Sequence, residues 1–441
     1  MKNTVLISKK IKKFNKKISV FGDKSLSIRW ALMAAQAIGK SRAYNLLNSE
    51  DINSTLKTLK KIGVKVKKRR NVCEIYGKGL NSFTFKNNTI IDAGNSGTLA
   101  RLILGVLVKS KNSVIIKGDK SLSRRDFSRV IKPLNLFGVK TRSYKNKLPL
   151  KIFGTNYLRP INYEELKGSA QVKSCIMLAA LNTPGTTKIT CIPSRDHTER
   201  LFKYLKLPIK IRKYKKFEII EIKGEKQYNG FDYKIPGDIS SGAFIIVLTL
   251  LSKNSQILIK NTNVNKSRTG IIDILKKMNA DIILKNKRIY NREAIADIIV
   301  KSTNSLKSIN CPTEMNSKAI DEFLLIFLVC ARAKGISYFK NIGELKHKES
   351  NRLKISANFL KMIGVKVEKT SNSLKIYGNP NLELNDNYVM KNFMKDHRVF
   401  MMSCVAALTL GGKWKIHDKD SINTSFPKFL SILKRLGGKI N

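Results

Sequence analysis

The chain has 441 residues, which is enough for two or three domains, and its 42% hydrophobic content can form the cores of a globular protein. It carries 85 Lys and Arg against 31 Asp and Glu, and the net charge of +54 would attract a nucleic acid or an anionic small molecule. Because the lysines are spread along the whole chain together with Ile and Asn, the charge indicates a general compositional bias as much as a binding patch, and we do not expect a nucleic-acid partner.

The sequence also argues against a membrane, secreted or metal-binding protein. Its N-terminal residues alternate Lys with single apolar residues and lack the apolar core of a signal peptide. The longest apolar runs, AFIIVLTLL and FLLIFLVCA, fall short of the roughly 20 residues that cross a bilayer. The six cysteines form no CxxC pair and have no His at metal-ligand spacing. We therefore predict a soluble cytoplasmic protein with reduced thiols.

One layout recurs along the chain: apolar residues at helical spacing, a residue suited to a left-handed helix end, and two short strands. It is found at residues 55–77, 129–154, 200–224, 270–290, 356–378 and, truncated, 429–440. The residue at the helix end is Gly, or Asn279 in the copy at 270–290. Six such units are too many for one core, so we predict two domains of three units each, with a boundary near YKIPGDIS.

Each unit also contains a second predicted helix that is apolar nearly all round and should therefore be buried at the centre of its domain. These helices cover residues 27–39, 98–108, 170–185, 240–252, 321–335 and 396–412. A polar, charged or Gly-rich segment precedes each of them. Because helix N-termini expose N–H groups and ligands prefer domain clefts, we expect the chemistry at these six starts.

Four of the starts place Lys or Arg beside small hydroxyl, amide or Gly residues, which are the groups that recognise phosphate and carboxylate. They contain Lys24, Ser25 and Arg29; Asn95, Gly97, Thr98 and Arg101; Ser169, Gln171 and Lys173; and Arg398. Each start alone could be an ordinary cap or turn. Their repetition at equivalent places predicts an anion-binding region.

Two further segments add carboxylates to this region. The start at residue 321 has Asp321 and Glu322 where the others have cations, and Asp321 is a candidate general base or, equally, a partner of the helix dipole. The segment ELKHKESNRLKI, residues 344–355, places Lys348, Glu349 and Arg352 in the first turn of a predicted helix. That turn would hold an anion, although a solvated charged turn has the same pattern.

These motifs form a longer ordered series. The segments are GDKSLSIRWALMAA (22–35), DAGNSGTLARL (92–102), GDKSLSRRDFSRV (118–130), GSAQVKS (168–174), SRDHTERL (194–201), PGDISSGAF (236–244), DEFLLIF (321–327), ELKHKESNRL (344–353), DHRVFM (396–401) and TSFPKF (424–429). In this order, and over almost the full length, the chain resembles the 5-enolpyruvylshikimate-3-phosphate synthase (3-phosphoshikimate 1-carboxyvinyltransferase) family.

The resemblance implies an α/β fold of two domains, each with three βαβαββ repeats about buried central helices, described as an inside-out α/β barrel. It places residues 24–236 in one domain, residues 1–23 plus 237–441 in the other, and the active site in the cleft between them. The implied reaction transfers the enolpyruvyl group of phosphoenolpyruvate to the 5-hydroxyl of shikimate 3-phosphate, through a tetrahedral intermediate, and releases phosphate. No metal or organic cofactor is implied, and a monomer is expected.

The resemblance also implies roles for single residues. Asp321 would be the general base, Glu349 the proton donor to C3, and Lys24 a further catalytic group. The residues that would bind shikimate 3-phosphate are Lys24, Ser25, Arg29, Ser169, Gln171, Ser194, Arg195, Asp321 and Lys348. Those that would bind phosphoenolpyruvate are Lys24, Gly97, Arg125, Gln171, Arg352 and Arg398.

The chain departs from the family pattern at three places: Asp126 stands where Pro is usual, Asn351 where Asp is common, and Thr424 where some members have a phosphoenolpyruvate-binding Lys. Three alternatives stay open. The sister transferase that acts on UDP-N-acetylglucosamine shares fold and chemistry, an RNA-end-processing protein of related fold would suit the charge, and an inactive paralogue would keep the fold alone. The motifs SAQVKS and SRDHTE favour shikimate 3-phosphate over the sugar nucleotide.

Overall fold

The computed structural model describes residues 3–69 and 72–441, and the chain folds into two compact units. The N-terminal unit consists of Gly22–Ile235 and Ile289–Glu293. The C-terminal unit consists of the chain up to Phe21, Pro236–Arg288 and Ala294–Asn441. The segment 289–293 lies in the N-terminal unit, whereas the resemblance to the family placed it in the other domain.

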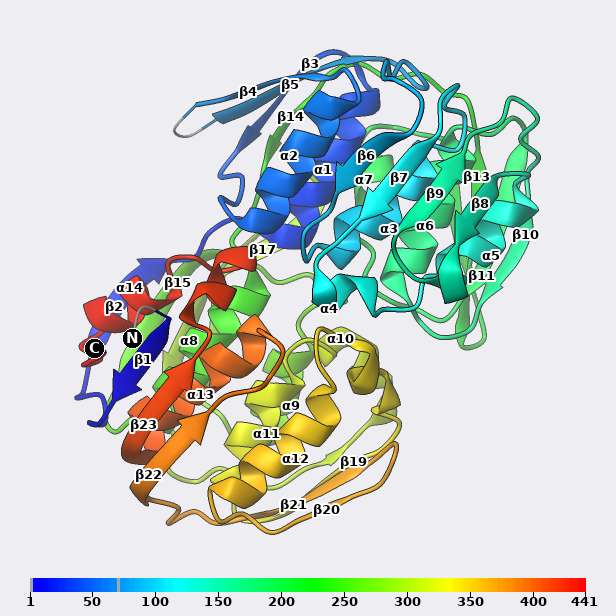
Figure 1. Cartoon of the computed structure of the whole chain (residues 1–441). Coiled ribbons are helices and arrows are strands. Elements are labelled where there is room, and N and C mark those ends of the chain that lie inside the picture. The colour runs from blue at the N-terminus through cyan, green and yellow to red at the C-terminus, as the bar shows by residue number, and fades with distance from the viewer. Residues whose placement is uncertain (1–2, 70–71) are drawn as a thin grey trace. The chain divides into compact units, whose positions relative to one another are not determined.

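Helices and strands alternate throughout the N-terminal unit (Figure 1). Its elements are α1 (Lys24–Gln36), β3 (Ile38–Tyr44), α2 (Glu50–Lys61), β4 (Lys65–Lys68), β5 (Val72–Lys78), β6 (Thr89–Asp92), α3 (Gly97–Val106), β7 (Val114–Lys117), α4 (Lys120–Ser123), α5 (Ser128–Leu136), β8 (Lys140–Ser143), η1 (Tyr144–Asn146), β9 (Leu150–Phe153), β10 (Asn162–Glu165), α6 (Ala170–Leu181), β11 (Thr186–Cys191), α7 (His197–Tyr204), β12 (Ile209–Tyr214), β13 (Phe217–Lys223) and β14 (Asp232–Lys234).

The C-terminal unit repeats the same alternation. Its elements are β1 (Thr4–Ile7), β2 (Asn15–Ser19), α8 (Ile239–Leu251), β15 (Gln256–Asn263), α9 (Gly270–Lys277), β16 (Ile282–Tyr290), β17 (Glu293–Lys301), β18 (Asn310–Cys311), η2 (Thr313–Met315), α10 (Asn316–Ala319), α11 (Phe323–Ala331), β19 (Gly335–Phe339), η3 (Gly343–His347), α12 (Arg352–Met362), β20 (Val367–Lys369), β21 (Leu374–Gly378), β22 (Leu384–Met390), α13 (His397–Leu410), β23 (Gly411–His417), η4 (Lys419–Thr424) and α14 (Phe429–Arg435).

The strands form one small sheet per repeat. In the N-terminal unit the strand orders are β14-β3-β5-β4, β6-β7-β9-β8 and β10-β11-β13-β12. In the C-terminal unit they are β16-β17-β15-β2, β18-β19-β21-β20 and β1-β23-β22. In the sheet of β6 to β9, for example, β6 and β7 are parallel across a helix, and the β8–β9 hairpin adds antiparallel strands. The predicted repeats are therefore confirmed.

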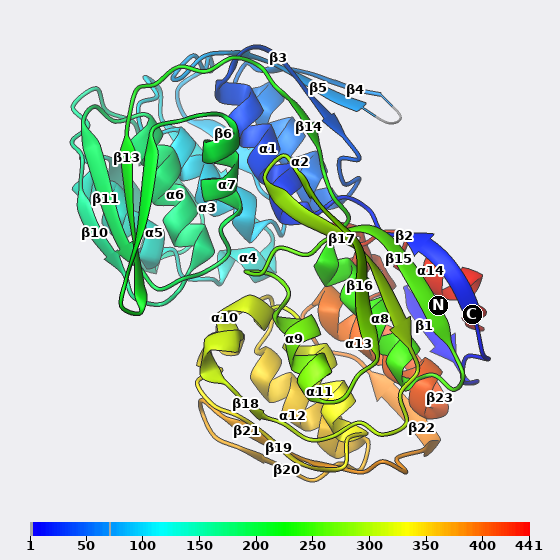
Figure 2. The ribbon, with the colours of Figure 1, turned by 180° about the vertical axis from the view of Figure 1, so that it is seen from behind.

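Three repeats are completed by strands from distant parts of the chain, which the sequence analysis did not predict. Strand β14 lies parallel to β3, and β2 lies parallel to β15 (Figure 2). The truncated last copy gains β1, which pairs with β23, while the backbones of Leu6 and Asn441 exchange hydrogen bonds. An unpaired strand edge exposes N–H and C=O groups, so these additions close edges that the local sequence leaves open.

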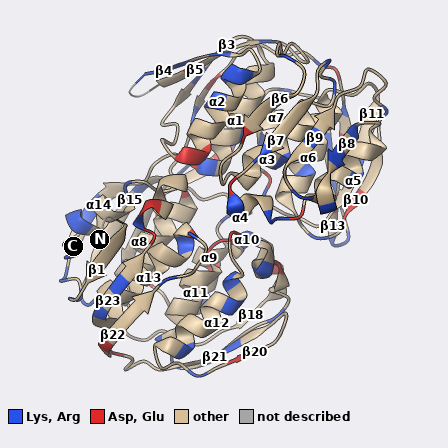
Figure 3. Ribbon diagram, in the orientation of Figure 1, with Lys and Arg blue, Asp and Glu red and all other residues tan. Residues whose placement is uncertain are grey.

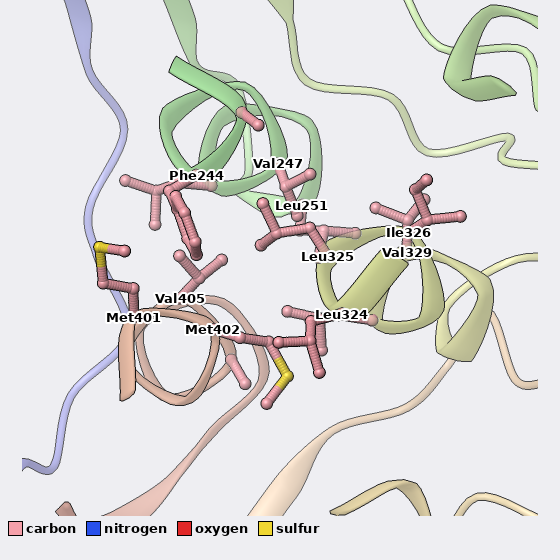
Figure 4. Close-up of a cluster of buried hydrophobic side chains, with 14 of the residues drawn as sticks. Phe244, Val247, Leu251, Leu324, Leu325, Ile326, Val329, Met401, Met402 and Val405 are labelled. Carbon is pink, nitrogen blue, oxygen red and sulfur yellow. The ribbon is translucent and has the colours of Figure 1, made fainter. Parts of the chain in front are cut away.

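The six apolar helices are buried as predicted. Every residue of α8, α11 and α13 is buried, and their side chains meet at the centre of the C-terminal unit (Figure 4). The residues in contact there include Phe244, Val247, Leu251, Leu324, Leu325, Ile326, Val329, Met401, Met402 and Val405. Each fully buried Leu or Phe side chain contributes roughly 1.5–3 kcal/mol. Burial on all sides is what permits helices without a polar face.

The predicted left-handed helix ends are found after the amphipathic helices. Gly63, Gly138, Gly364 and Gly437 have φ between +79° and +102°, and Asn279 has φ +70°. The prediction of a Gly at this place is wrong for the copy at residues 200–224, where Lys206 takes the left-handed conformation with φ +52°. Its sequence signal was therefore weaker although its geometry is the same.

Lys and Arg occur on helices and strands of both units, in agreement with a compositional bias (Figure 3). All six cysteines are buried and free of disulfides. Within the described residues, no helix has both the length and the apolar character that a membrane crossing requires.

Candidate active site

The start of α1 carries Lys24, one cation of the predicted site. The Asp23 side chain accepts a hydrogen bond from the backbone N–H of Leu26 at 2.9 Å, which caps the helix and fixes its first turn. Lys24 Nζ lies 2.9 Å from Asp51 Oδ2, and Ser25 follows directly. Lys24 is therefore held by a carboxylate of α2 that the sequence analysis did not single out.

Arg29, one turn further along α1, is buried, and hydroxyl groups of two other helices fix its guanidinium group. Its Nε donates to Thr198 Oγ1 at 2.8 Å and its Nη2 to Ser174 Oγ at 2.9 Å. The two hydroxyls are 2.7 Å apart. These contacts join α1, α6 and α7 at one point, so the predicted anion-binding arginine is held rigidly.

The starts of α3 and α6 are joined by polar contacts. Arg101 Nη1 donates to Gln171 Oε1 at 2.9 Å, and Gln171 Nε2 donates to Thr98 Oγ1 at 3.1 Å. A Cβ atom on Gly97 would lie 2.8 Å from Arg101 Nη1 and 2.9 Å from Arg125 Nη1. Gly97 is thus the residue that leaves room for two guanidinium groups at the helix start.

Four more predicted residues lie in loops of the same unit. The Ser169 side chain caps α6 by accepting from the N–H of Val172 at 3.4 Å. Arg125 Nη2 donates to Asn95 Oδ1 at 3.2 Å. Ser194 and Arg195 form the loop that leads into α7. Gly97 therefore lies beside the guanidinium groups of Arg101 and Arg125, and Arg101 contacts Gln171. Arg29 contacts α7 through Thr198.

In the C-terminal unit, Asp321 is surrounded by three cations. Its Oδ1 atom lies 3.4 Å from Lys348 Nζ and 3.5 Å from Arg352 Nη1. Its Oδ2 atom lies 3.9 Å from Arg398 Nη2, and its backbone carbonyl accepts from Arg398 Nη1 at 2.9 Å. Such a group of cations around one carboxylate suits the binding of anions.

Arg352 is almost completely buried and contacts further carboxylates. It donates to Asp396 Oδ2 from Nε at 2.9 Å and to Glu349 Oε2 from Nη2 at 2.6 Å. Burial lowers the pKa of Arg352, but the carboxylates outweigh burial and raise it above its ordinary value. Burial raises the pKa of Asp396, and Arg352 outweighs this and holds it below its ordinary value. The pair is therefore charged.

A second polar network connects Arg398 to the start of α8. Arg398 Nη1 lies 3.5 Å from Glu322 Oε1, which accepts from Ser240 Oγ at 2.5 Å. Arg268 Nη2 donates to Ser240 Oγ at 2.7 Å and to Asp238 Oδ1 at 3.2 Å. Arg268 was not predicted, because it lies in the loop between β15 and α9 outside any motif at a helix start.

One local prediction is wrong. Lys348 and Glu349 precede α12, which begins at Arg352 with Asn351 as its N-cap, so they do not share a helical face with Arg352. They come close to it because the chain after η3 is extended at Lys348, with ψ −161°. Asn351 accepts from the N–H of Lys354 at 3.0 Å, and this capping role explains an amide at that place.

The other two departures from the family pattern are also locally satisfied. The Asp126 carboxylate accepts from the N–H of Ser128 at 2.8 Å and from its hydroxyl at 2.5 Å, and it faces the start of α5. Thr424 Oγ1 donates to the carbonyl of Ser421 at 2.8 Å. In the part of the chain that the structure describes, no group of three or more His, Cys, Asp or Glu could hold a metal ion.

Known proteins resemble this chain over nearly its whole length. Residues 8–433 match the family model for EPSP synthase (3-phosphoshikimate 1-carboxyvinyltransferase). A 3-phosphoshikimate 1-carboxyvinyltransferase of Ruthia magnifica is 39% identical over 429 residues, which is 96% of each chain. The structure of EPSP synthase from Acinetobacter baumannii aligns with a TM-score of 0.85 at 32% identity, over 100% of this chain and 99% of that one.

A more distant likeness concerns the fold alone. The enolpyruvyl transferase NikO from Streptomyces tendae aligns with a TM-score of 0.77 at 14% identity, over 100% of this chain and 98% of that one. The two-domain α/β fold is thus shared by enolpyruvyl transferases of very different sequence. The family model and the more similar relatives, in contrast, all carry the description 3-phosphoshikimate 1-carboxyvinyltransferase or EPSP synthase. The chain therefore belongs to the EPSP synthase (3-phosphoshikimate 1-carboxyvinyltransferase) family, transferases of the shikimate pathway.

Proposed function

We propose that this chain transfers the enolpyruvyl group of phosphoenolpyruvate to the 5-hydroxyl of shikimate 3-phosphate and releases phosphate, through a tetrahedral addition–elimination intermediate. The observation that carries the proposal is that Asp321 and Glu349 both contact the buried Arg352, with Lys348 and Arg398 beside Asp321. Two carboxylates among cations supply a proton acceptor and a proton donor where anionic substrates bind.

In the addition step, Asp321 takes the proton of the 5-hydroxyl while the hydroxyl oxygen bonds to C2 of phosphoenolpyruvate. Glu349 gives a proton to C3, and the tetrahedral intermediate forms. In the elimination step Glu349 takes a proton back from C3, the C2–O bond to phosphate breaks, and phosphate departs with the bonding electrons. The proton that Asp321 took from the hydroxyl is transferred to the departing phosphate, so both carboxylates return to their starting protonation states.

Glu349 must be protonated to act as a donor, and its contact with Arg352 at 2.6 Å favours the charged form. Two strongly anionic substrates would offset the positive field of the arginines when they bind. The two carboxylates then share the proton transfers of one turnover. We therefore assign the pair, rather than each carboxylate alone, to proton transfer.

The binding residues divide between the substrates. For shikimate 3-phosphate we propose Lys24, Ser25, Arg29, Ser169, Gln171, Ser194, Arg195, Asp321 and Lys348. For phosphoenolpyruvate we propose Lys24, Gly97, Arg125, Gln171, Arg352 and Arg398. Guanidinium groups suit both phosphate and carboxylate because their N–H groups form a planar fork. Lys24 is proposed for both substrates.

We also propose that the chain acts as a cytoplasmic monomer that needs neither a cofactor nor a nucleic acid. The six buried, unpaired thiols suit a reducing compartment. Burial raises the pKa of Cys175 to about 12, so this thiol is not a nucleophile at neutral pH. Light scattering after size-exclusion chromatography should give the mass of one chain, 49.8 kDa, and a dimer mass would contradict the monomer.

The decisive experiment measures phosphate release from phosphoenolpyruvate with shikimate 3-phosphate, with UDP-N-acetylglucosamine, or with no acceptor. The enzymes compared are the wild type, Asp321→Ala and Glu349→Ala. Glu383→Ala is the matched control, because Glu383 is an exposed carboxylate of the same unit that pairs with Lys10. We expect release to depend on shikimate 3-phosphate and to fall at least about 100-fold in both site variants, as removal of a general acid or base does.

The other outcomes are equally informative. Release only with the sugar nucleotide would assign the chain to the sister reaction. No release with either acceptor would overturn the proposed activity, and salt-dependent RNA binding would then be examined. Full activity in Asp321→Ala or Glu349→Ala would remove that carboxylate from the mechanism.

A further inference from the structure

Three consecutive residues at the start of α7 are buried, polar and bound to three different partners. The His197 ring contacts Glu293, the Thr198 hydroxyl accepts from Arg29, and the Glu199 carboxylate lies 2.5 Å from Lys173 Nζ. Burying polar groups is costly unless each one is paired. The first turn of α7 is therefore a polar junction inside the N-terminal unit, directly after the loop of Ser194 and Arg195.

The contact between His197 and Glu293 is the least expected of the three. His197 Nδ1 and Glu293 Oε1 are 2.7 Å apart, neither side chain is exposed, and 96 positions separate the two residues in the sequence. Glu293 arrives with the tip of the β16–β17 hairpin, the segment 289–293 that is grouped with this unit. No motif at a helix start contains it.

Two further hydrogen bonds hold the same hairpin tip. Arg200 Nη1, from α7, donates to the backbone carbonyl of Arg292 at 2.8 Å. The backbone N–H of Lys234 donates to Asn291 Oδ1 at 3.3 Å. Asn291 and Arg292 have positive φ, as residues of a tight turn do. The tip is thus fixed against α7 at two points, of which the buried pair is the one nearer the loop.

We infer that Glu293 is a positioning residue for shikimate 3-phosphate, and that it acts through His197 on the loop of Ser194 and Arg195. This inference rests on the proposed function. His197 is two residues from Arg195, so a carboxylate that fixes the imidazole also fixes the backbone on which Arg195 is carried. A displacement of about 1 Å in a binding group can cost up to about 100-fold in rate.

The experiment compares Glu293→Ala, Glu293→Gln and a control with the wild-type full chain. The control is Tyr228→Phe, which loses a different buried hydrogen bond of the same unit, from the Tyr228 hydroxyl to the carbonyl of Met33. Calorimetry measures the binding of shikimate 3-phosphate without phosphoenolpyruvate, steady-state kinetics measures both KM values and kcat, and thermal denaturation measures stability.

We expect Glu293→Ala to weaken the binding of shikimate 3-phosphate about tenfold or more and to raise its KM in proportion. The KM of phosphoenolpyruvate and kcat should change much less, because Glu293 is neither a proposed phosphoenolpyruvate-binding residue nor a proposed proton-transfer residue. Glu293→Gln should recover most of the affinity, since its amide oxygen can still accept from an Nδ1–H of His197. Tyr228→Phe should lower stability and leave both KM values unchanged.

Two results would overturn the inference while the proposed function stands. One is unchanged affinity for shikimate 3-phosphate in Glu293→Ala. The other is a parallel loss in all kinetic parameters that follows the loss of stability, as in a purely structural contact. If Glu293→Ala does not fold, Glu293→Asp gives the same test, because it keeps the charge and shortens the reach. A wild type that does not bind shikimate 3-phosphate at all would contradict the proposed function itself.

Discussion

Arg352 is held by carboxylates from three separate segments of the C-terminal unit. Asp396 precedes α13, Glu349 precedes α12, and Asp321 precedes α11. A buried guanidinium is stable only when its charge is paired, and loss of one partner from a buried pair costs about 3–5 kcal/mol. The same pairing fixes the direction of the Arg352 side chain, so stability and ligand binding depend on one set of contacts.

Asp396→Asn tests this dual role. The amide keeps the shape of the carboxylate but removes its negative charge. In the wild type, the carboxylate accepts hydrogen bonds from Arg352 Nε at 2.9 Å and from Ser350 Oγ at 2.8 Å. We expect kcat/KM for phosphoenolpyruvate to fall at least about tenfold, because Arg352 loses its buried anchor. Steady-state kinetics checks this, with Glu383→Ala as the control. Unchanged kinetics would mean that Glu349 and Asp321 suffice to orient Arg352.

The same substitution predicts a pH effect with a definite sign. The folded-state pKa of Asp396 is below its ordinary value of 3.8, so the folded state favours the carboxylate. Its stabilisation is complete above about pH 4 and is lost as the pH falls through the lower folded value. We expect the free energy of unfolding of the wild type to decrease more steeply below pH 4 than that of Asp396→Asn, as measured by urea denaturation. Parallel curves would contradict the assigned pairing.

Gly97→Ala tests the room left at the start of α3. The added methyl group would meet the ends of the Arg101 and Arg125 side chains at 2.8 and 2.9 Å. Both ends are flexible, so we expect normal folding and displaced guanidinium groups. The KM of phosphoenolpyruvate should rise roughly tenfold with a smaller change in kcat. An unchanged KM would mean that Arg125 does not contact this substrate, and thermal denaturation controls for a change in stability.

At the scale of elements, each unit is organised around helices that could not stand alone in water. Helices α3 and α6 approach so closely that a Cβ atom on Gly105 would lie 2.2 Å from the carbonyl oxygen of Cys175. Backbone atoms cannot move aside as side-chain ends can. The close approach matters for the site, because it sets the relative positions of the two helix starts that carry Gly97 and Gln171.

Gly105→Ala should therefore destabilise the protein by about 1–3 kcal/mol or more, as overpacking does in buried contacts. Gly242→Ala is the matched control, since Gly242 also lies in a buried helix. Among the described residues outside the backbone of that helix, its Cβ atom would meet only Thr262 Cγ2 within 4 Å, at 3.9 Å. That variant should be neutral or up to about 1 kcal/mol more stable, because Ala favours the helix. Urea denaturation measures both, and equal effects would contradict the packing argument.

At the scale of the whole molecule, the net charge of +54 should assist the capture of anionic substrates. Salt screens such long-range attraction, with a Debye length of about 10 Å at 0.1 M. We expect kcat/KM for shikimate 3-phosphate to fall several-fold between about 0.02 and 0.2 M NaCl, with kcat nearly constant. As a control for viscosity, kcat/KM is also measured with added sucrose, which is uncharged. A flat kcat/KM would mean that the charge has no role in substrate capture.

The sequence by itself predicted the repeats, the six buried helices and the composition of the helix starts. These features have local causes: apolar residues on all sides of a helix, Gly or Asn at a left-handed end, and capping residues before the first turn. The motifs of the family then assigned roles to Lys24, Asp321 and Arg398 before any geometry was known. Local patterns sufficed because the residues within each repeat determine its helices and strands.

Tertiary structure alone decided which side chains meet. Asp51 reaches Lys24, Thr198 reaches Arg29, and Asp396 reaches Arg352, each from a different element. Glu293 contacts His197 across 96 positions, and the last repeat takes its missing strand from the N-terminus. No periodicity within one segment can reveal such contacts, because the free energy that selects them comes from burying charged groups together and closing sheet edges between segments far apart in the chain.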